Sequence, residues 1–429
     1  LWFARLQRGY SPFRRVLQSQ AAMSLVMLPL GALFFGGGSL VAVLANLLMI
    51  PLLGWVVVPL ALLAATCYLC GWQVASTLWQ LAAWPLEVLL PLASELGDTR
   101  GAWLYLPLNA GVELAMLGVL AVALLVLPGR GGVKAVALLM AVPMLVPVRP
   151  LSSAPSRNTE VTVLDVGQGT AVVVRAGQRA LLYDTGGGDP DGVNMGSLAV
   201  LPYLHERGIT SLDTLVISHP DLDHSAGTAV VRNAFPVGRY RYGGVSAEDA
   251  MAMAAGRPCV AGEAWRWPGG QTFQFLSPAL HTPRGRNNSS CVLQVQVGDY
   301  RLLVPGDIEA EREKNLVRYW GEQLRSDWLA AAHHGSNTST SATFLKHVQP
   351  QVVVISNGYA NRFGHPHPRV TERLHHREAL VLSTAASGAL ELVPWIRVVN
   401  LARALEEIAG EGYWRIGLTG HTDLILSDA

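Results

Sequence analysis

The chain has 429 residues, of which 50% are hydrophobic and 15% are charged. Together with its positive mean hydropathy, this composition excludes an ordinary soluble protein with a polar surface throughout. The formal net charge of +1 does not by itself indicate nucleic acid as a partner.

The first third of the chain predicts a multi-span α-helical membrane domain over residues 1–148. No Asp, Glu, Lys or Arg occurs between Arg15 and Glu87, and this stretch is long enough for about three spans of roughly 20 residues each. Breaks are expected at Gly36–Gly38, Pro51, Pro59 and Gly71, which gives spans over 19–35, 39–58 and 59–86. Two further apolar runs, 112–127 and 135–148, bring the prediction to about five spans. Because the chain starts at Leu1 without a Met or a signal peptide, we expect upstream spans to be missing.

Polar and special residues inside these spans leave two interpretations open. The run from Ala45 to Pro51, which contains Asn46, is typical either of a broken helix that lines a polar path or of a kink filled by a neighbouring helix. Cys67 and Cys70 lie in an apolar span and are interpreted as packing residues. The four cysteines of the chain predict no disulfide framework.

Basic residues near the spans predict the orientation of the chain in a cell inner membrane. Four arginines precede the first span, Arg130 and Lys134 precede the last, and the region 87–113 is mainly acidic. By the positive-inside rule, the two basic regions face the cytoplasm. Five spans then carry the second half of the chain to the extracytoplasmic side.

The second half of the chain predicts an α+β sandwich with two sheets inside and helices outside, over residues 159–393. A Pro- and Ser-containing linker, 149–158, precedes it, and a tail of unknown role, 394–429, follows. Hydrophobic periodicity changes to two after the linker, as strands require. Strands are predicted over 160–166, 170–175, 180–184, 214–218, 291–297, 300–304 and 351–356, and helices over 198–207 and 309–320.

Four metal-seeking side chains lie within six residues directly after the apolar run 214–218. They are His219, Asp221, Asp223 and His224. Any one of them alone is typical of a polar loop that caps a strand. Burying two carboxylates and two imidazoles together without a cation would be costly, however, so the run as a whole predicts a metal site. In an extended turn His219 and Asp221 point the same way, while Asp223 and His224 diverge toward a second ion.

Further metal-seeking residues follow later apolar runs. Asp307 ends one strand, His333 and His334 follow another apolar run, and His365 and His367 flank Pro366. Each is weak alone, but together they predict one site for two divalent cations, with Asp307 as a bridging ligand. The predicted metal ligands are His219, Asp221, Asp223, His224, Asp307 and His334.

Five motifs in order give the chain a resemblance to a known family. They are Asp165–Gly169, Asp184–Gly187, the run from His219 to His224, Gly306–Asp307 and His333–Ser336. Together they resemble the metallo-β-lactamase fold in the version carried by the ComEC family of DNA internalisation (competence) proteins. The run 45–51 with Val58 and Pro59 is similar to the competence domain of that family.

The resemblance implies DNA uptake across the cytoplasmic membrane during natural transformation. The membrane half would form the channel, and the metallo-β-lactamase-like domain would act as a nuclease that degrades the strand not transported. Expected partners are double-stranded donor DNA, the transported single strand, other competence proteins and further copies of the chain. Two other hypotheses stay open: a channel with an inactive soluble domain, and a membrane-anchored metallohydrolase of a non-nucleic ester.

The chain departs from the wider fold at two of its ligand positions. Asp221 stands where most relatives have a second histidine, and Asn287–Ser290 stands where a further histidine is usual. More oxygen and less nitrogen shifts the preference from zinc toward manganese, although the affinity order favours zinc where both are present.

Phosphodiester hydrolysis is the chemistry expected of two such cations, which lower the pKa of a water and neutralise a phosphate. His333 and His365 are the candidate catalytic residues, because either could protonate the leaving oxygen. Arg239 and Arg241, with Arg232, Arg284 and Arg286 nearby, are candidates for gripping nucleic acid. Solvated surface arginines are the alternative.

Overall fold

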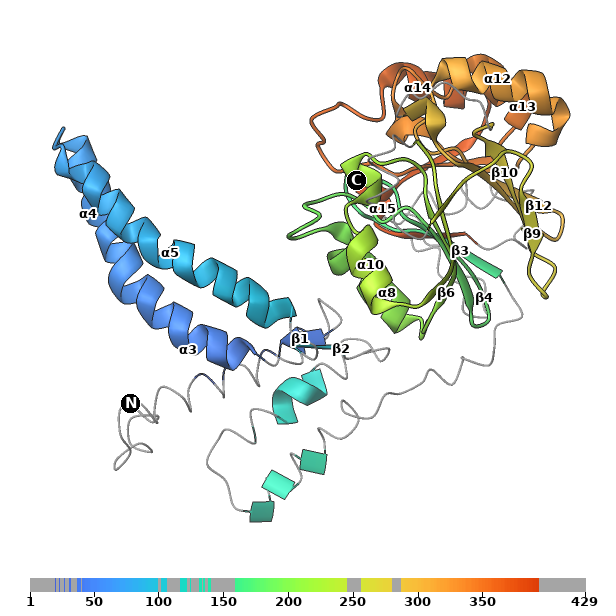
Figure 1. Ribbon diagram of the computed structural model, residues 1–429. Coiled ribbons are helices and arrows are strands. Elements are labelled where there is room, and N and C mark those ends of the chain that lie inside the picture. The colour runs from blue at the N-terminus through green and yellow to red at the C-terminus, as the bar shows by residue number, and fades with distance from the viewer. Residues whose placement is uncertain are drawn as a thin grey trace, which may run out of the picture. The chain divides into compact units, whose positions relative to one another are not determined.

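The computed structural model describes residues 37–39, 41–98, 102–105, 116–121, 159–244, 256–279 and 287–392, with isolated positions between 20 and 139. The chain divides between Leu151 and Ser152 into two compact units (Figure 1), each of which has its own architecture. The predicted linker 149–158 and tail 394–429 lie outside the described residues, as do most of the first predicted span and of the two apolar runs after residue 111.

The first unit is built around two long helical segments that pack side by side as an antiparallel hairpin (Figure 1). Its elements are β1 (Gly37–Ser39), α3 (Ala42–Leu52), the π-helical turn η1 (Leu53–Val57), α4 (Val58–Leu69), α5 (Val74–Asp98) and β2 (Trp103–Tyr105). The strands β1 and β2 pair antiparallel. Helices α3 and α4 follow each other through η1 without a break.

The breaks predicted at Pro51 and Pro59 are wrong, because the helix continues through both residues. Proline cannot donate the helical hydrogen bond and crowds the carbonyl four residues earlier. The wider π turn Leu53–Val57 lies just before Pro59 and contains Trp55, the residue whose carbonyl would have accepted the hydrogen bond that Pro59 cannot donate. Pro51 lies inside α3 itself. The chain does break at Gly71, at φ +73°, as predicted. The predicted span 59–86 is therefore divided between α4 and α5, and the interpretation of 45–51 as a broken helix is wrong.

One helical stretch in the described part of the chain is long and apolar enough to cross a membrane on its own. It is Leu44–Leu69, with 26 residues and a mean hydropathy of 2.5 in its 18-residue apolar window. Trp55 and Leu69 on this stretch are 86% and 85% exposed. Apolar side chains exposed to this degree are typical of surfaces that contact lipid or another protein.

The second unit contains two seven-stranded β-sheets packed face to face (Figure 1). The first sheet consists, in spatial order, of β16 (Leu390–Leu392), β3 (Thr159–Val163), β4 (Val172–Ala176), β5 (Arg179–Tyr183), β6 (Leu212–Ile217), β7 (Val237–Tyr242) and β8 (Arg257–Pro258). The second consists of β15 (Leu380–Ser383), β14 (Val352–Ile355), β13 (Trp328–Ala330), β12 (Tyr300–Val304), β11 (Val292–Val297), β10 (Thr272–Ser277) and β9 (Ala264–Arg266).

Helices cover the outer face of each sheet, so the unit has four layers. The first sheet carries η2 (Gly196–Val200), α8 (Leu201–Glu206) and α10 (Thr228–Ala234), and the short helix α9 (Leu222–Ser225) follows β6. The second carries α12 (Ala310–Trp320), α13 (Ala342–Val348) and α14 (Pro368–His375), and α15 (Thr384–Ser387) follows β15.

Alternation along the strands divides the core into three apolar layers. Leu181 and Tyr183 of β5 face the second sheet, whereas Leu182 between them faces the helices. On the other side, Leu303 of β12 packs against Leu316 of α12. This arrangement confirms the predicted sandwich of two sheets flanked by helices. The predicted strands over 291–297 and 300–304 are confirmed as β11 and β12, which pair antiparallel, and the predicted helix over 309–320 is confirmed as α12.

A disulfide between Cys259 and Cys291 corrects the expectation that the cysteines form no bridge. Cys259 follows β8 of the first sheet and Cys291 precedes β11 of the second, and both are buried. The bond therefore ties the two sheets together. Closing a loop of 32 residues contributes roughly 3–4 kcal/mol in the chain-entropy treatment. Cys67 and Cys70 remain free thiols.

Candidate metal centre

The carboxyl ends of strands from both sheets meet at one edge of the sandwich. His219 comes directly after β6 of the first sheet, Asp307 follows β12 of the second, and His334 follows β13. Strands β12, β13 and β14 are parallel neighbours, so the loops after them emerge at the same edge. Segments that are far apart in sequence thereby contribute to one cluster.

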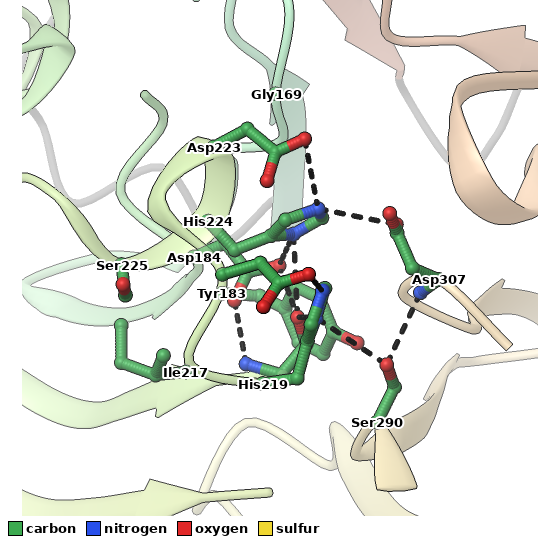
Figure 2. A network of polar contacts seen from close by, with 12 residues as sticks. Gly169, Tyr183, Asp184, Ile217, His219, Asp223, His224, Ser225, Ser290 and Asp307 are labelled. Atoms are coloured by element: carbon green, nitrogen blue, oxygen red, sulfur yellow. Dashed lines mark hydrogen bonds and ion pairs between the residues drawn. The ribbon is translucent and has the colours of Figure 1, made fainter. Parts of the chain in front are cut away.

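Four side chains form the centre of this cluster: Asp223, His224, Asp307 and His334. Each offers one ligand atom, and these atoms lie within 4.8 Å of one another. The Nε2 atom of His224 is 3.1 Å from Oδ1 of Asp307, and Nε2 of His334 is 3.3 Å from Oδ2 of Asp223. Figure 2 shows the imidazole of His224 between the carboxylates of Asp223 and Asp307. A divalent cation can be held by such a mixed oxygen and nitrogen set.

Hydrogen bonds at Nδ1 fix the direction of the histidine rings. The Nδ1 contacts are His219 to Oγ of Ser218 at 3.0 Å, His224 to Oδ2 of Asp184 at 2.7 Å, and His334 to the carbonyl of Ser356 at 3.0 Å. Partners of this kind hold the imidazole so that the opposite nitrogen faces a metal. The Nε2 atoms of all three histidines are buried, and none makes a hydrogen bond with the described residues.

Asp184 is the buried carboxylate that organises this network. It is fully buried, and its two oxygens accept hydrogen bonds from the backbone N–H of Ser218 at 2.6 Å and from its hydroxyl at 2.7 Å. One of these oxygens also contacts Nδ1 of His224. Burial raises the pKa of Asp184, and the nearby His224 and Ser218 partly offset that rise. Asp184 belongs to the sequence motif Asp184–Gly187, but the sequence did not predict what this residue does.

The carboxylates and imidazoles of the cluster stabilise each other's charged forms, as the directions of their pKa shifts indicate. Burial acts to lower the pKa of His224, but the carboxylates of Asp307 and Asp184 outweigh it and raise that pKa well above its ordinary value. Burial acts to raise the pKa of Asp307, yet His224 and His334 hold it well below the usual range. In the same way the histidines lower the pKa of Asp223 to about 2. A cation is thus favoured at the point where these groups meet.

His219 is chemically ready to act as a ligand at neutral pH. Burial and the neighbouring His224 lower its pKa to about 3, so the imidazole is neutral and its Nε2 lone pair is available. That atom is 3.7 Å from Oδ2 of Asp221. The donor set of the site therefore fits a divalent cation, and His219 with Asp221 adds a second, sparser group of donors beside the four-residue centre.

Two backbone features hold the ligand loops in place. Gly169 has φ +139°, and a Cβ there would overlap the backbone carbonyl of Asp223, so this contact requires glycine. His333 and His334 both have positive φ, 53° and 54°. For residues other than glycine this conformation is unfavourable, and it is concentrated at functional sites. It turns the chain sharply after β13 and brings His334 into the cluster.

The two predicted catalytic histidines lie at the rim of the cluster. Nε2 of His333 is 3.7 Å from Oδ2 of Asp307. The ring of His365 is 5.9 Å from that of His333 and 6.5 Å from that of His334, centroid to centroid. Burial and the neighbouring histidines lower the pKa of His365. Both side chains are close enough to the centre to contact a group bound there.

The predicted nucleic-acid residues Arg239 and Arg241 are not part of the cluster. Both belong to β7, in which Arg239 is in register with Thr214, five residues before His219. At about 3.3 Å per residue, this places Arg239 roughly 16 Å from the metal ligands along the strand. Arg241 is paired with Glu263 at 2.7 Å. Arg284 and Arg286 lie outside the described residues.

Sequence reasoning missed the groups that support the ligands from behind. Besides Asp184 and Ser218, these are Ser290 and Ser356. The hydroxyl of Ser290 accepts a hydrogen bond from the backbone N–H of Asp307 at 3.2 Å and lies 3.4 Å from Nδ1 of His219. No pattern in the sequence distinguishes these serines from others, because their role depends on segments that are distant in the chain.

Fold and site together define the second unit as a metallo-β-lactamase-type domain. Residues 164–359 match the metallo-beta-lactamase superfamily, and residues 1–131 match the family described as competence protein. The metallo hydrolase Igni18 of Ignicoccus hospitalis, a solved structure, is 14% identical, with a TM-score of 0.35; the match covers 55% of this chain and 99% of that one.

Three curated proteins are similar in sequence to this chain. Competence protein ComA of Neisseria gonorrhoeae is 36% identical over 87% of this chain and 51% of its own length. Recombination protein 2 of Haemophilus influenzae is 38% identical, over 54% of this chain and 28% of its own. ComE operon protein 3 of Bacillus subtilis is 31% identical, over 55% and 33%. The chain thus combines a region that matches competence proteins with a region that matches the metallo-β-lactamase superfamily, and over most of its length it is similar to ComEC-type competence proteins. It spans about half the length, or less, of these curated relatives.

Replacing the Asp307 carboxylate, which contacts both His224 and His334, should remove the bound cation. We expect Asp307→Asn to weaken divalent metal binding by more than about 100-fold, because even residues behind the ligands contribute 10- to 100-fold. The measurement is metal content by mass spectrometry of the full chain in neutral detergent, after dialysis against micromolar Mn²⁺ or Zn²⁺. Asp299→Asn, in the exposed turn between β11 and β12, is the matched control. A wild-type metal content in Asp307→Asn would contradict the site.

Removing the charge of Asp184 should weaken the metal without removing a ligand. Asp184→Asn keeps the shape of the side chain but loses the carboxylate that orients His224, so we expect a 10- to 100-fold higher metal dissociation constant. Asp327→Asn is the control, because Asp327 also accepts a backbone hydrogen bond, from Arg301 at 2.8 Å, outside the cluster. Equal thermal unfolding of both variants with unchanged metal affinity in Asp184→Asn would refute this role.

Proposed function

We propose that this chain takes part in DNA uptake across the cytoplasmic membrane in natural transformation. In this proposal the first unit contributes to the channel, and the second hydrolyses phosphodiesters of the strand that is not transported. The observation that carries the proposal is the four-residue centre of Asp223, His224, Asp307 and His334 in a chain that also has a competence domain. The names of two relatives, competence protein and recombination protein, support the same role.

Two groups of donors support the proposal of two divalent cations. Asp223, His224 and His334 would hold one together with Asp307, whose Oδ1 faces His224 and whose Oδ2 faces His334. His219 and Asp221 would hold the other, and Asp307 is the carboxylate that we propose as the bridge between the two. Oxygen donors suit manganese, and the imidazoles equally suit zinc. When bound, the cations supply Lewis-acid stabilisation of a phosphate and an activated water.

The residues of the chain itself would position the phosphate and move the proton. His333 and His365 lie at the rim, and neither belongs to the four-residue centre. The lowered pKa of His365 means that it is neutral at pH 7 and has to gain a proton, or to orient a water, before it can act on the leaving oxygen. His333, whose side chain is partly exposed and near Glu309 at 3.9 Å, has access to solvent for that exchange.

DNA cleavage by the full chain tests the enzymatic part of the proposal. We expect cleavage of single- or double-stranded DNA that requires Mn²⁺ or Zn²⁺, is abolished in Asp223→Ala, and falls by about 10²- to 10⁴-fold in His365→Ala with its metal content unchanged. The measurement is gel analysis of end-labelled DNA with the chain in neutral detergent, with Asp299→Asn as the active control. A metal-loaded chain that leaves both forms of DNA intact would point to another ester or to an inactive soluble domain.

The membrane part of the proposal rests on the apolar surface of the first unit. Helix α5 and the stretch Leu44–Leu69 together expose many large apolar side chains, including Trp55, Leu62 and Trp84. Further copies of the chain or other competence proteins could cover part of this surface, and lipid would cover the rest. The several spans that the sequence predicts would favour a channel over a simple anchor.

The disulfide supports an extracytoplasmic position for the metal-bearing unit. Structural disulfides form and persist in oxidising compartments and are rare in the cytosol. Cys259 and Cys291 are both in the second unit, whereas the free Cys67 and Cys70 are in the first. The basic residues before the first span independently favour the same orientation.

Thiol counting in cells tests this orientation. We expect alkylation of the acid-quenched full chain to modify two cysteines without reductant and all four after reduction. In a Gram-negative host that lacks its periplasmic thiol oxidase, about four should react without reductant, because the disulfide would not form. Cys291→Ala is the control, with three reactive thiols in either host. Four reactive thiols in the normal host would place the second unit in the cytoplasm.

A further inference from the structure

A second polar site lies at the end of the sandwich opposite to the metal cluster. It is a pocket of about 240 Å³, which we call the arginine pocket. The residues that line it are Arg179, Asp213, Thr214, Gly238, Arg239, Trp265, Arg266 and Trp267. Because β6 and β7 are parallel and in register, these residues lie near the amino ends of the strands whose carboxyl ends carry the ligands.

Both sheets contribute to the arginine pocket. Thr214 of β6 pairs with Leu181 of β5 on one side and with Arg239 of β7 on the other, so the first sheet provides a row of neighbouring positions. Trp265 and Arg266 come from β9, the edge strand of the second sheet. The guanidinium of Arg239 lies over the Trp265 ring, 5.7 Å from its centroid. The pocket is therefore part of the folded sandwich and not an arrangement of a loop.

The arginine pocket carries positive charge that the described residues do not neutralise. Asp213 is its single carboxylate, and it is paired with Arg179 at 3.0 Å. Among the described residues, neither Arg239 nor Arg266 has a hydrogen bond or ion pair to a carboxylate. Trp265 also has a buried indole N–H that donates to no described residue. Two unpaired guanidinium groups in one concave site are suited to a phosphate group.

The chemistry of the lining favours a phosphate in a DNA strand over the headgroup of a lipid. A bound lipid needs an apolar groove beside its headgroup, but no Leu, Ile, Val, Phe or Met lines this pocket. Its volume is below the roughly 300–1,000 Å³ of sites for small molecules, and a phosphate with its sugar would fit. Single-stranded DNA is commonly held by arginines beside aromatic rings.

We propose that the arginine pocket binds a backbone phosphate of a DNA single strand and is a holding point for the strand whose other part lies at the metal cluster. This inference rests on the proposed function, because it takes DNA as the polymer at the cluster. The separation of roughly 16 Å along β6 corresponds to a few nucleotides. Because the contact is with the DNA backbone, binding would not depend on the base sequence.

Binding of a labelled single strand to the full chain in neutral detergent tests the proposal. All proteins carry Asp223→Ala, so that cleavage and metal contacts do not contribute. The pocket variant adds Arg239→Ala and Arg266→Ala. The control instead adds Arg318→Ala and Arg325→Ala, which remove the same charge from exposed positions beyond the second sheet. The readouts are fluorescence anisotropy between 50 and 300 mM salt and thermal unfolding.

We expect the pocket variant to bind the strand at least about tenfold more weakly at 50 mM salt, with a slope of log affinity against log salt that is smaller by about 1.4 for two lost contacts. The control should bind like its parent, and all proteins should unfold at the same temperature. Equal binding by the pocket variant and its parent would overturn the inference and leave the metal-dependent cleavage assay as a separate test of the proposed function.

Two other results would also overturn the inference. The first is a parent chain that binds no single strand although the wild type cleaves DNA, since the cluster would then act alone. The second is an unchanged affinity for DNA combined with loss of phosphatidylglycerol adducts in native mass spectrometry of the pocket variant. That result would assign the pocket to a lipid headgroup.

Discussion

The buried contact between Asp184 and His224 is the interaction on which the site depends. A charged carboxylate at zero exposure is costly, and it is stable here because it accepts hydrogen bonds from Ser218 and contacts His224. This contact fixes the ring of His224, and the opposite nitrogen then faces Asp307. Since the carboxylates outnumber the charges that histidine can supply, a cation completes the balance. The same arrangement therefore orients the His224 ring through Nδ1 and places carboxylates beside its Nε2.

These groups come together only if the two sheets keep fixed positions relative to each other. The apolar layer between the sheets provides most of that constraint, and the Cys259–Cys291 bond adds a covalent one. Cys291 also receives a hydrogen bond at its carbonyl from the Tyr183 hydroxyl and donates its N–H to the carbonyl of Ser218. The disulfide therefore lies one residue from Ser290, which supports both Asp307 and His219. A covalent link between the sheets and the geometry of the metal ligands are coupled through the backbone.

The two ends of the sandwich differ in charge, and this difference gives the proposed function a direction. Carboxylates and imidazoles gather where the strands end, and arginines gather where they begin, two of them without an ion pair to any described residue. A polyanion is attracted to the arginines by its charge, but approaches the carboxylates favourably only where cations offset them. Holding and cleavage can thus be separate functions of one rigid scaffold, about 16 Å apart.

The sequence by itself determined the local elements and the residue types of the site. Alternation of two predicted the strands around β3 to β6, and the density of ligands between His219 and His224 predicted a metal site, because such groups are not buried together without a cation. Only the tertiary structure decided which loops meet. It brought Asp184, Ser290 and Ser356 behind the ligands, paired cysteines 32 residues apart, and separated Arg239 from the cluster. The continuation of the helix through Pro51 and Pro59, with a π turn between them, was likewise decided only by the structure. Contacts between distant segments depend on how whole sheets pack, and hydrophobic periodicity contains no information on that packing.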